Sequence, residues 1–419
     1  MKTRWLPIEL DGKTMVFGGF LLAGNFKADP RLSWLPVDLT LLLALLTIAY
    51  LAIALHKNQY RLPLPLFWMW GLFFLFLLPL YWIEWTAYGT EKVWKLFSFT
   101  LLAAIAPLFL CKGESEIRNV FQIMTCLAII MGVDSFTSWL LAGQGGAHAN
   151  STGMTAFGSS TIALGRTTGL AFLWIFLLAV ESRMNAALAI GLLAFFLLVL
   201  IGSGSRGPLM SLLAVAAVAG PLYYGRKGKQ IGIFCIGLLI LSLVMTTALS
   251  ILPQSATNRI QSFLEGDLGA SELSRLTAFE RSWETIAAHP FGIGWGGFAH
   301  EINLWQGETR QYPHNIWLEI TLEGGWLAGL ALLALFYAGF SRLYRHLRSF
   351  EARALFAALL YFLLNAMVSG DINDNKLLFA LAGVALVFTP RKAQEHAEKE
   401  RKEHEFTVAV KREVNDCEP

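Results

Sequence analysis

Long apolar stretches separated by short polar segments dominate this chain. A membrane-spanning helix needs about 20 mostly apolar residues, because the hydrocarbon core of a bilayer is about 30 Å thick and a helix rises about 1.5 Å per residue. Twelve stretches approach this pattern: 15–26, 36–55, 64–83, 92–110, 117–142, 163–181, 185–202, 207–224, 230–252, 322–344, 353–369 and 376–390. The pattern predicts an all-α polytopic membrane protein with about 12 transmembrane helices, of which the first is the shortest.

The composition excludes a soluble domain. Of 419 residues, 55% are hydrophobic and only 15% are charged, whereas a soluble domain carries about 25% charged residues. The net charge of +3 is too small to indicate a nucleic-acid partner. The four cysteines are scattered, so we expect neither a zinc site nor a disulfide framework. Membrane lipids are therefore the first predicted partner.

The distribution of Lys and Arg predicts the orientation. With the N-terminus in the cytoplasm, 22 of the 33 Lys and Arg residues face the cytoplasm, which agrees with the positive-inside rule. We expect both termini to be cytoplasmic. The chain then divides into nine helices within 1–252, an external loop at 253–313, three helices within 314–390 and a charged cytoplasmic tail at 391–419. An external loop of that length is usually functional.

One candidate anion site joins two predicted spans. The segment 202–208 reads GSGSRGP, and Pro208 suits the first turn of the helix that follows. The free N–H groups at the positive end of that helix would lie beside Arg206, which suits a phosphate group. The alternative is a tight turn whose arginine extends to the membrane interface.

The external loop contains a second candidate. Residues 271–289 (SELSRLTAFERSWETIAAH) place Leu273, Leu276, Trp283, Ile286 and Ala287 at nearly helical spacing. Ser271 can cap this helix, and Pro290 ends it. We expect an amphipathic helix on the outer membrane surface, with Arg275 and Phe279 on one side. Arginines of such helices usually face water, which is the competing interpretation.

The glycines that follow this helix have an ordinary explanation. Gly292, Gly294 and Gly297 form a literal GxGxxG, but no strand precedes it and no helix of a βαβ unit follows. We therefore expect these glycines to permit a sharp chain reversal rather than to bind a dinucleotide.

Tyr312-Pro313-His314-Asn315 provides a candidate base. We expect this segment to open a helix that continues into the span near 322–344, with His314 in its exposed first turn. An imidazole with an ordinary pKa near 6.5 is mostly neutral at neutral pH and can accept a proton. Glu319 lies about 140° around such a helix from His314 and need not contact it. An interfacial histidine without a chemical role is the alternative.

Together these motifs resemble the O-antigen ligase and O-antigen polymerase superfamily of bacterial envelope glycosyltransferases. The resemblance rests on the order of SGSRG, Arg275-x3-Phe279, His289-Pro290-x-Gly292-x-Gly294-x-Gly296 and Pro313-His314-Asn315. The motifs span about 203–325, and Phe279 stands where the family often has Trp. The resemblance implies a GT-C-type glycosyltransferase fold with a large periplasmic loop, in the inner membrane of a Gram-negative bacterium.

The resemblance also implies a reaction and its residues. An undecaprenyl-pyrophosphate-linked glycan would be the donor, and a sugar hydroxyl of the lipid A core would be the acceptor. Arg206 and Arg275 would bind the pyrophosphate, His314 would act as the base or help position it, and Asn315, Glu319 and Arg281 are supporting candidates.

We expect no cofactor and an inverting, metal-independent reaction. The chain has no DxD motif, and Asp371 and Asp374 lie in a short external turn where carboxylates are usually solvated. Four alternatives remain open from the sequence. Two are enzymes of the same superfamily, an O-antigen polymerase and a protein O-oligosaccharyltransferase. The third is a polysaccharide transporter, which twelve spans favour but which would place its ionisable groups near the bilayer midplane. The fourth is a structural partner within an envelope assembly, which would tolerate loss of His314 and both arginines.

Overall fold

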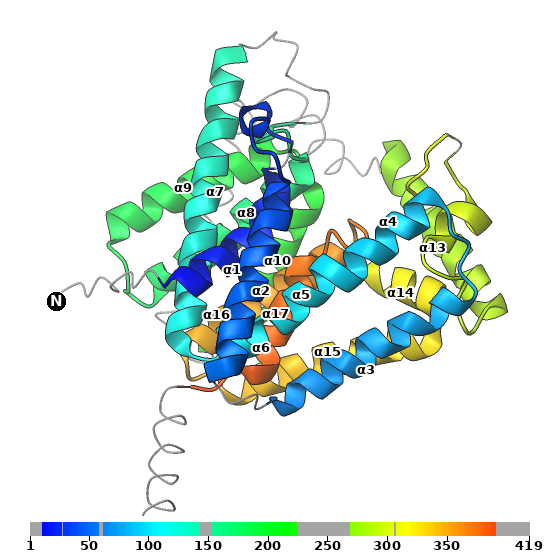
Figure 1. Cartoon of the computed structure of the whole chain (residues 1–419). Coiled ribbons are helices and arrows are strands. Elements are labelled where there is room, and N and C mark those ends of the chain that lie inside the picture. The colour runs from blue at the N-terminus through cyan, green and yellow to red at the C-terminus, as the bar shows by residue number, and fades with distance from the viewer. Residues whose placement is uncertain are drawn as a thin grey trace, which may run out of the picture.

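The computed structural model describes residues 11–26, 28–57, 62–142, 153–224, 269–305 and 307–390 (Figure 1). Within these residues every regular element is helical and no β-strand occurs. The amino-terminal half contains α1 (Gly12–Leu22), α2 (Leu39–Lys57), α3 (Leu64–Leu77), α4 (Ala87–Lys95), α5 (Leu101–Ile105), α6 (Pro107–Leu110), α7 (Glu114–Ala142), α8 (Thr161–Val180), α9 (Ala186–Gly202) and α10 (Arg206–Tyr224). The rest contains α13 (Gly269–Ala288), α14 (Ile316–Gly324), α15 (Trp326–Arg345), α16 (Phe350–Ala366) and α17 (Lys376–Val387).

Five short turns of helix connect these elements. They are η1 (Ala23–Asn25), η2 (Pro30–Leu32), η3 (Leu78–Tyr81), η4 (Leu96–Thr100) and η6 (Phe298–Ile302). The wide π-helical turn η4 joins α4 to α5, so that one apolar segment runs from Ala87 to Leu110.

Seven helical segments of the described residues are long and apolar enough to cross a membrane. They are Leu39–Lys57, Leu64–Tyr81, Ala87–Leu110, Glu114–Leu141, Thr161–Val180, Arg206–Tyr223 and Trp326–Arg345. Each overlaps a span predicted from the sequence. A helix satisfies its own backbone hydrogen bonds, which is why apolar segments of this length fold as helices in lipid. The chain is a multi-pass membrane protein.

The other predicted spans correspond to shorter helices or lie outside the described residues, so a count of twelve is not confirmed. Stretches 185–202 and 376–390 correspond to α9 and α17, which have 17 and 12 residues. Stretches 15–26 and 353–369 correspond to α1 and α16, of 11 and 17 residues. Stretch 230–252 lies outside the described residues.

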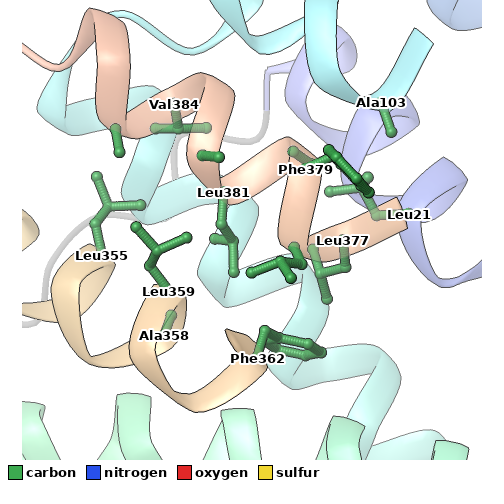
Figure 2. Close-up of a cluster of buried hydrophobic side chains, with 14 of the residues drawn as sticks. Leu21, Ala103, Leu355, Ala358, Leu359, Phe362, Leu377, Phe379, Leu381 and Val384 are labelled. Carbon is green, nitrogen blue, oxygen red and sulfur yellow. The ribbon is translucent and has the colours of Figure 1, made fainter. Parts of the chain in front are cut away.

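The core of the described structure centres on α17. Every residue from Leu377 to Val387 is buried, and Figure 2 shows side chains of α17 meeting those of α16, α1 and α5. A Cβ atom at Gly383 would lie 2.4 Å from the carbonyl oxygen of Ala104. The two backbones therefore touch, which is the close approach that small residues allow between membrane helices.

Polar contacts between loops gather at two ends of the helices. At one end, Ser349 donates to Glu114 at 2.9 Å, Arg118 pairs with Glu351 at 3.3 Å, and Arg353 pairs with Glu181. These groups lie at the starts of α7 and α16 and the end of α8. The loops predicted to be cytoplasmic therefore meet one another.

The other end of the same helices carries the loops predicted to be external. Arg31 pairs with Asp134 at 2.8 Å, and Asp134 accepts from the backbone of Phe157 at 2.9 Å. The backbone N–H of Met154 donates to the carbonyl of Gly202 at 2.8 Å. The candidate chemical residues belong to this end.

Candidate functional site

The SGSRG segment forms a tight turn between α9 and α10. Gly204 has a φ of +64°, which glycine adopts without strain, and the N–H of Ser205 donates to Ser203 Oγ at 3.2 Å. Arg206 is the first residue of α10 and Pro208 the third. The structure confirms the predicted turn and places Pro208 in the first turn of the helix.

This turn packs against two other helices near their ends. A Cβ atom at Gly165 of α8 would lie 3.2 Å from Ser203 Oγ, and one at Gly207 would lie 3.3 Å from Cγ2 of Val368, just beyond α16. The Arg206 turn is thereby fixed beside the start of α8 and beside the loop that leads to α17 (Figure 1).

Arg166 of α8 lies in this region and was not among the site residues predicted from the sequence. Its side chain is buried, and Nη2 donates to the carbonyl oxygens of Ser369 at 2.6 Å and Asn365 at 3.3 Å. Its Nε has no hydrogen-bond partner among the described residues. The signal was present in the sequence, because an ionisable residue inside a predicted membrane span marks a functional site by default.

The α13 helix confirms the predicted helix at 271–289, with one correction. It begins at Gly269, so Ser271 lies inside the first turn and is not its cap. Ala278, Ser282 and Ile286 are buried. Because residues four apart share one face of a helix, these three form the side that packs on α14.

Three of the apolar residues that predicted the amphipathic helix lie on its exposed side, whereas Ile286 is buried. Leu273, Leu276 and Trp283 are 46–57% exposed, and Trp283 packs against Trp317 with ring centroids 5.4 Å apart. An exposed apolar face at this position is what a membrane-surface helix needs.

The two arginines of α13 have different surroundings. Arg275 is partly buried, and its charge acts on His314. Arg281 is 60% exposed and pairs with Glu284 at 3.1 Å. Arg281 therefore faces away from the groups that converge near His314.

His314 lies just before a helix rather than inside one. Asn315 is the N-cap of α14, and α14 ends at Gly324. Gly325, with a φ of +84°, separates α14 from α15. The prediction of one continuous helix from His314 into 322–344 is therefore wrong.

The imidazole of His314 is held by aromatic neighbours. Its ring centroid lies 4.5 Å from that of Tyr312 and 5.8 Å from that of Trp305. Its backbone φ is +57°, an uncommon value for a residue with a side chain. Its Nδ1 is buried and has no hydrogen-bond partner among the described residues.

The electrostatic surroundings keep this imidazole neutral. Burial and the positive charge of Arg275 lower the pKa of His314 to about 4, and the negative charge of Asp371 opposes both. Since this pKa lies well below 7, the imidazole is unprotonated at neutral pH and can accept a proton, as a weaker base than an ordinary histidine.

Asn315 has a structural role as the N-cap of α14. Its side-chain oxygen accepts from the backbone N–H groups of Trp317 at 3.1 Å and Leu318 at 3.0 Å. This is the ordinary bonding of a helix N-cap. Asn315 therefore fixes where α14 begins, directly after His314.

Glu319 belongs to a buried ion cluster. Its Oε1 lies 2.6 Å from Nζ of Lys92, and Oε2 of Glu323 lies 2.5 Å from the same Nζ. All three side chains have an exposed fraction of zero. Lys92 was missed because its partners are more than 220 residues away in the sequence.

The loop before α17 provides two carboxylates. Oδ1 of Asp371 accepts from the N–H groups of Asn373 at 2.9 Å and Asp374 at 2.8 Å, and the hydroxyl of Tyr88 donates to Oδ2 at 3.4 Å. Asp374 is exposed. In the described ranges, no three His, Cys, Asp or Glu side chains come together as a metal site would require.

The glycine segment after α13 confirms the predicted chain reversal. Gly292, Gly294 and Gly296 have φ values of +83° to +85°. A Cβ atom at Gly292 would lie 2.6 Å from the carbonyl oxygen of Glu323, and one at Gly296 would lie 2.8 Å from Cα of Gly89. The segment thus packs its bare backbone against α14 and α4.

These residues bring a proton acceptor and several cations to one end of the helices. His314, Arg275 and Asp371 are close enough for their charges to interact, and Arg166 and the Arg206 turn contact the loop that carries Asp371. Such a set can bind an anionic group and remove a proton from a hydroxyl beside it.

A comparison with protein families gives one match. Residues 191–333 match a family model described as O-antigen ligase. The match begins in α9 and ends in α15, so it contains Arg206, Arg275, His314 and Glu319. Searches of curated proteins and of solved structures gave no match. The match confirms the resemblance seen in the sequence over residues 191–333, which are similar to the O-antigen ligase family.

Proposed function

We propose that this protein is an O-antigen ligase. It transfers O-antigen polysaccharide from undecaprenyl pyrophosphate to a sugar hydroxyl of the lipid A core, on the periplasmic face of the inner membrane. The observation that supports this most strongly is the neutral, half-buried imidazole of His314 within the electrostatic reach of Arg275. The match to the O-antigen ligase family spans both residues.

In this proposal His314 begins the reaction. The imidazole accepts the proton of the acceptor hydroxyl while the hydroxyl oxygen bonds to the anomeric carbon of the donor sugar. The bond between that carbon and the phosphate oxygen breaks, and its electron pair leaves with the undecaprenyl pyrophosphate. Attack opposite the leaving group inverts the anomeric centre.

The arginines neutralise the negative charge of the leaving pyrophosphate. Arg206 stands at the N-terminus of α10, where free backbone N–H groups and the helix dipole favour an anion. Arg275 comes from α13, and its charge acts on His314. Arginine binds phosphate oxygens with two parallel hydrogen bonds and stays charged at every accessible pH. Arg166, whose side chain is buried and donates to the carbonyl of Ser369 in the loop before α17, adds a third positive charge.

We propose that no metal ion takes part. Transfer from a pyrophosphate needs positioning and charge stabilisation, and fixed arginines supply both. We expect the purified enzyme to keep its full rate after treatment with EDTA and exchange into metal-free buffer, measured as product bands on a gel. A lost rate that only Mg²⁺ or Mn²⁺ restores would contradict this part of the proposal.

A deletion strain tests the proposed function in cells. Loss of a ligase leaves bare lipid A core and an accumulated lipid-linked polymer, and the intact gene restores the lipopolysaccharide ladder. A deletion strain that shows core capped with a single repeat would identify a polymerase instead. A glycosylated protein acceptor would identify a protein O-oligosaccharyltransferase, and an unpolymerised donor trapped on the cytoplasmic face would identify a transporter.

A further inference from the structure

The buried cluster of Lys92, Glu319 and Glu323 has no part in the proposed reaction. Its three charged side chains have an exposed fraction of zero. Burying charges costs free energy, and replacing such a cluster with apolar side chains is often neutral or stabilising. Its presence in this chain therefore needs a reason other than stability.

The cluster holds four segments together. Lys92 comes from α4, and both glutamates come from α14. Oε1 of Glu319 also accepts from the backbone N–H of Ile372 at 3.2 Å, which attaches the loop that carries Asp371. Oε1 of Glu323 accepts from the N–H of Phe298 at 3.5 Å, which attaches the end of the glycine segment.

A second contact ties the same loop to α4. The side-chain nitrogen of Asn373 donates to the backbone carbonyl of Lys92 at 3.0 Å, and Oδ1 of Asn373 accepts from the hydroxyl of Thr100 at 2.9 Å. The loop around Asp371 is thus bound both to the side chain of Glu319 and to the backbone beside Lys92.

The position of His314 depends on the helix that the cluster fixes. His314 directly precedes the N-cap of α14, and Glu319 lies in the first turn of that helix, where its N–H donates to the carbonyl of Asn315 at 2.9 Å. A shift of α14 would therefore move His314 relative to Asp371.

We propose that Lys92, Glu319 and Glu323 are positioning residues, which hold His314 and the Asp371 loop in the geometry needed for proton transfer. The proposal rests on the proposed function and adds to it a set of residues that act through α14 and the Asp371 loop without touching substrate. Such residues can affect the rate strongly, because a displacement of a reacting group by about 1 Å can lower the rate about 100-fold.

Replacement of Glu319 tests this inference. Glu319→Ala leaves Lys92 paired with Glu323 but detaches Ile372. With purified full-length protein, undecaprenyl-pyrophosphate-linked O-antigen and rough lipopolysaccharide, we expect kcat per folded molecule to fall about 100-fold, with KM for the donor within about threefold of the wild-type value. Glu319→Gln keeps an oxygen that can accept from Lys92 and Ile372, and we expect it to restore kcat to within about threefold.

Glu351 provides a matched control. Its carboxylate is buried and pairs with Arg118 at 3.3 Å. It lies at the start of α16, at the opposite end of that helix from the loop that carries Asp371. Glu351→Ala should lower thermal stability and leave kcat per folded molecule unchanged. Asn373→Ala is a second, milder variant, because it removes only the contacts of the Asp371 loop with Thr100 and with the backbone of Lys92. We expect kcat to fall about tenfold, less than the 100-fold fall expected for Glu319→Ala, with KM for the donor unchanged.

The results separate the possible roles. A Glu319→Gln enzyme as slow as Glu319→Ala would mean that the carboxylate itself takes part in the chemistry. A Glu319→Ala enzyme with lower stability but wild-type kcat would mean a structural role only, and if that variant does not fold, wild-type kcat in Asn373→Ala overturns the inference. No transfer by the wild-type protein would instead refute the proposed function.

Discussion

His314 combines two features that suit a general base. It is neutral, because burial and the charge of Arg275 lower its pKa to about 4, and its Nδ1 has no hydrogen-bond partner among the described residues. A histidine that served only to pack the loop would more commonly donate one ring N–H to a neighbour. The residue thus keeps a proton-accepting form across the whole neutral range.

The effect of Arg275 on this pKa gives a prediction for the pH profile. The neutral imidazole is the active form, so the rate falls as pH drops through the pKa of His314. Removing the positive charge in Arg275→Gln removes one cause that lowers this pKa, which then moves from about 4 towards its ordinary value. We expect the acidic limb of kcat/KM to move to higher pH, whatever the loss in maximum rate.

Arg281→Gln is the matched control for that measurement. Arg281 lies on the same helix, but it is 60% exposed and paired with Glu284. Its replacement should leave the acidic limb in place. If Arg275→Gln gave a limb at the wild-type position, Arg275 and His314 would not interact as the structure indicates.

Among the elements, the break between α14 and α15 sets the geometry of the site. Gly325 has φ +84° and ψ 169°, a conformation that essentially only glycine adopts. A Cβ atom there would lie 2.7 Å from the carbonyl carbon of Phe291. We expect Gly325→Ala to lower the free energy of unfolding by about 1–3 kcal/mol or more, measured by thermal unfolding of the protein in detergent.

Gly191 offers the opposite case for comparison. It lies inside α9, and a Cβ atom added there would meet nothing within 4 Å. Gly191→Ala should therefore be neutral or stabilise by about 0.5–1 kcal/mol. If both substitutions changed the free energy of unfolding by the same amount, residues other than glycine could adopt the conformation at Gly325 without strain.

The sequence predicts the elements whose length the bilayer dictates. The predicted stretches 117–142 and 163–181 correspond to α7 (Glu114–Ala142) and α8 (Thr161–Val180), because hydropathy alone sets such lengths. The break at Gly325 was not predictable in this way. It depends on a hydrogen bond from Trp326 N–H to the carbonyl of Pro290 and on contact with Phe291, which come from a distant part of the chain.

The same reason explains which site residues were found. Arg206, Arg275 and His314 stand in local motifs that can be recognised in sequence. Arg166 and Lys92 were missed because the groups that define them, such as Ser369 and Glu323, lie about 200 residues or more away. Long-range polar contacts inside apolar segments leave only one sign in a sequence, the presence of the charged residue itself.

At the scale of the whole molecule, the loops sort into two groups at opposite ends of the helices. One group contains the contacts of Glu114, Glu181 and Arg353, and the other contains the candidate site. This arrangement matches the alternation of predicted inside and outside loops. It leaves the absolute orientation as a prediction from the Lys and Arg distribution.

Labelling of single cysteines tests that orientation. In a variant that lacks the four native cysteines, Arg281→Cys should react with a membrane-impermeant thiol reagent added to the periplasm. Arg348→Cys should react only after the membrane is permeabilised, since the predicted topology places it in the cytoplasm. Both residues are exposed, so access to the reagent depends on the side of the membrane alone. The reverse pattern would invert the topology.

Reconstitution in lipid vesicles shows whether His314 removes a proton from the acceptor while nearby cations hold a diphosphate. Purified protein in lipid vesicles is supplied with undecaprenyl-pyrophosphate-linked O-antigen and rough lipopolysaccharide, and product is followed on gels. We expect transfer by the wild-type protein and by His289→Ala, which replaces an exposed histidine. We expect a rate about 100- to 10,000-fold lower for His314→Ala. A wild-type rate of transfer by a correctly folded His314→Ala protein would show that His314 is not the base.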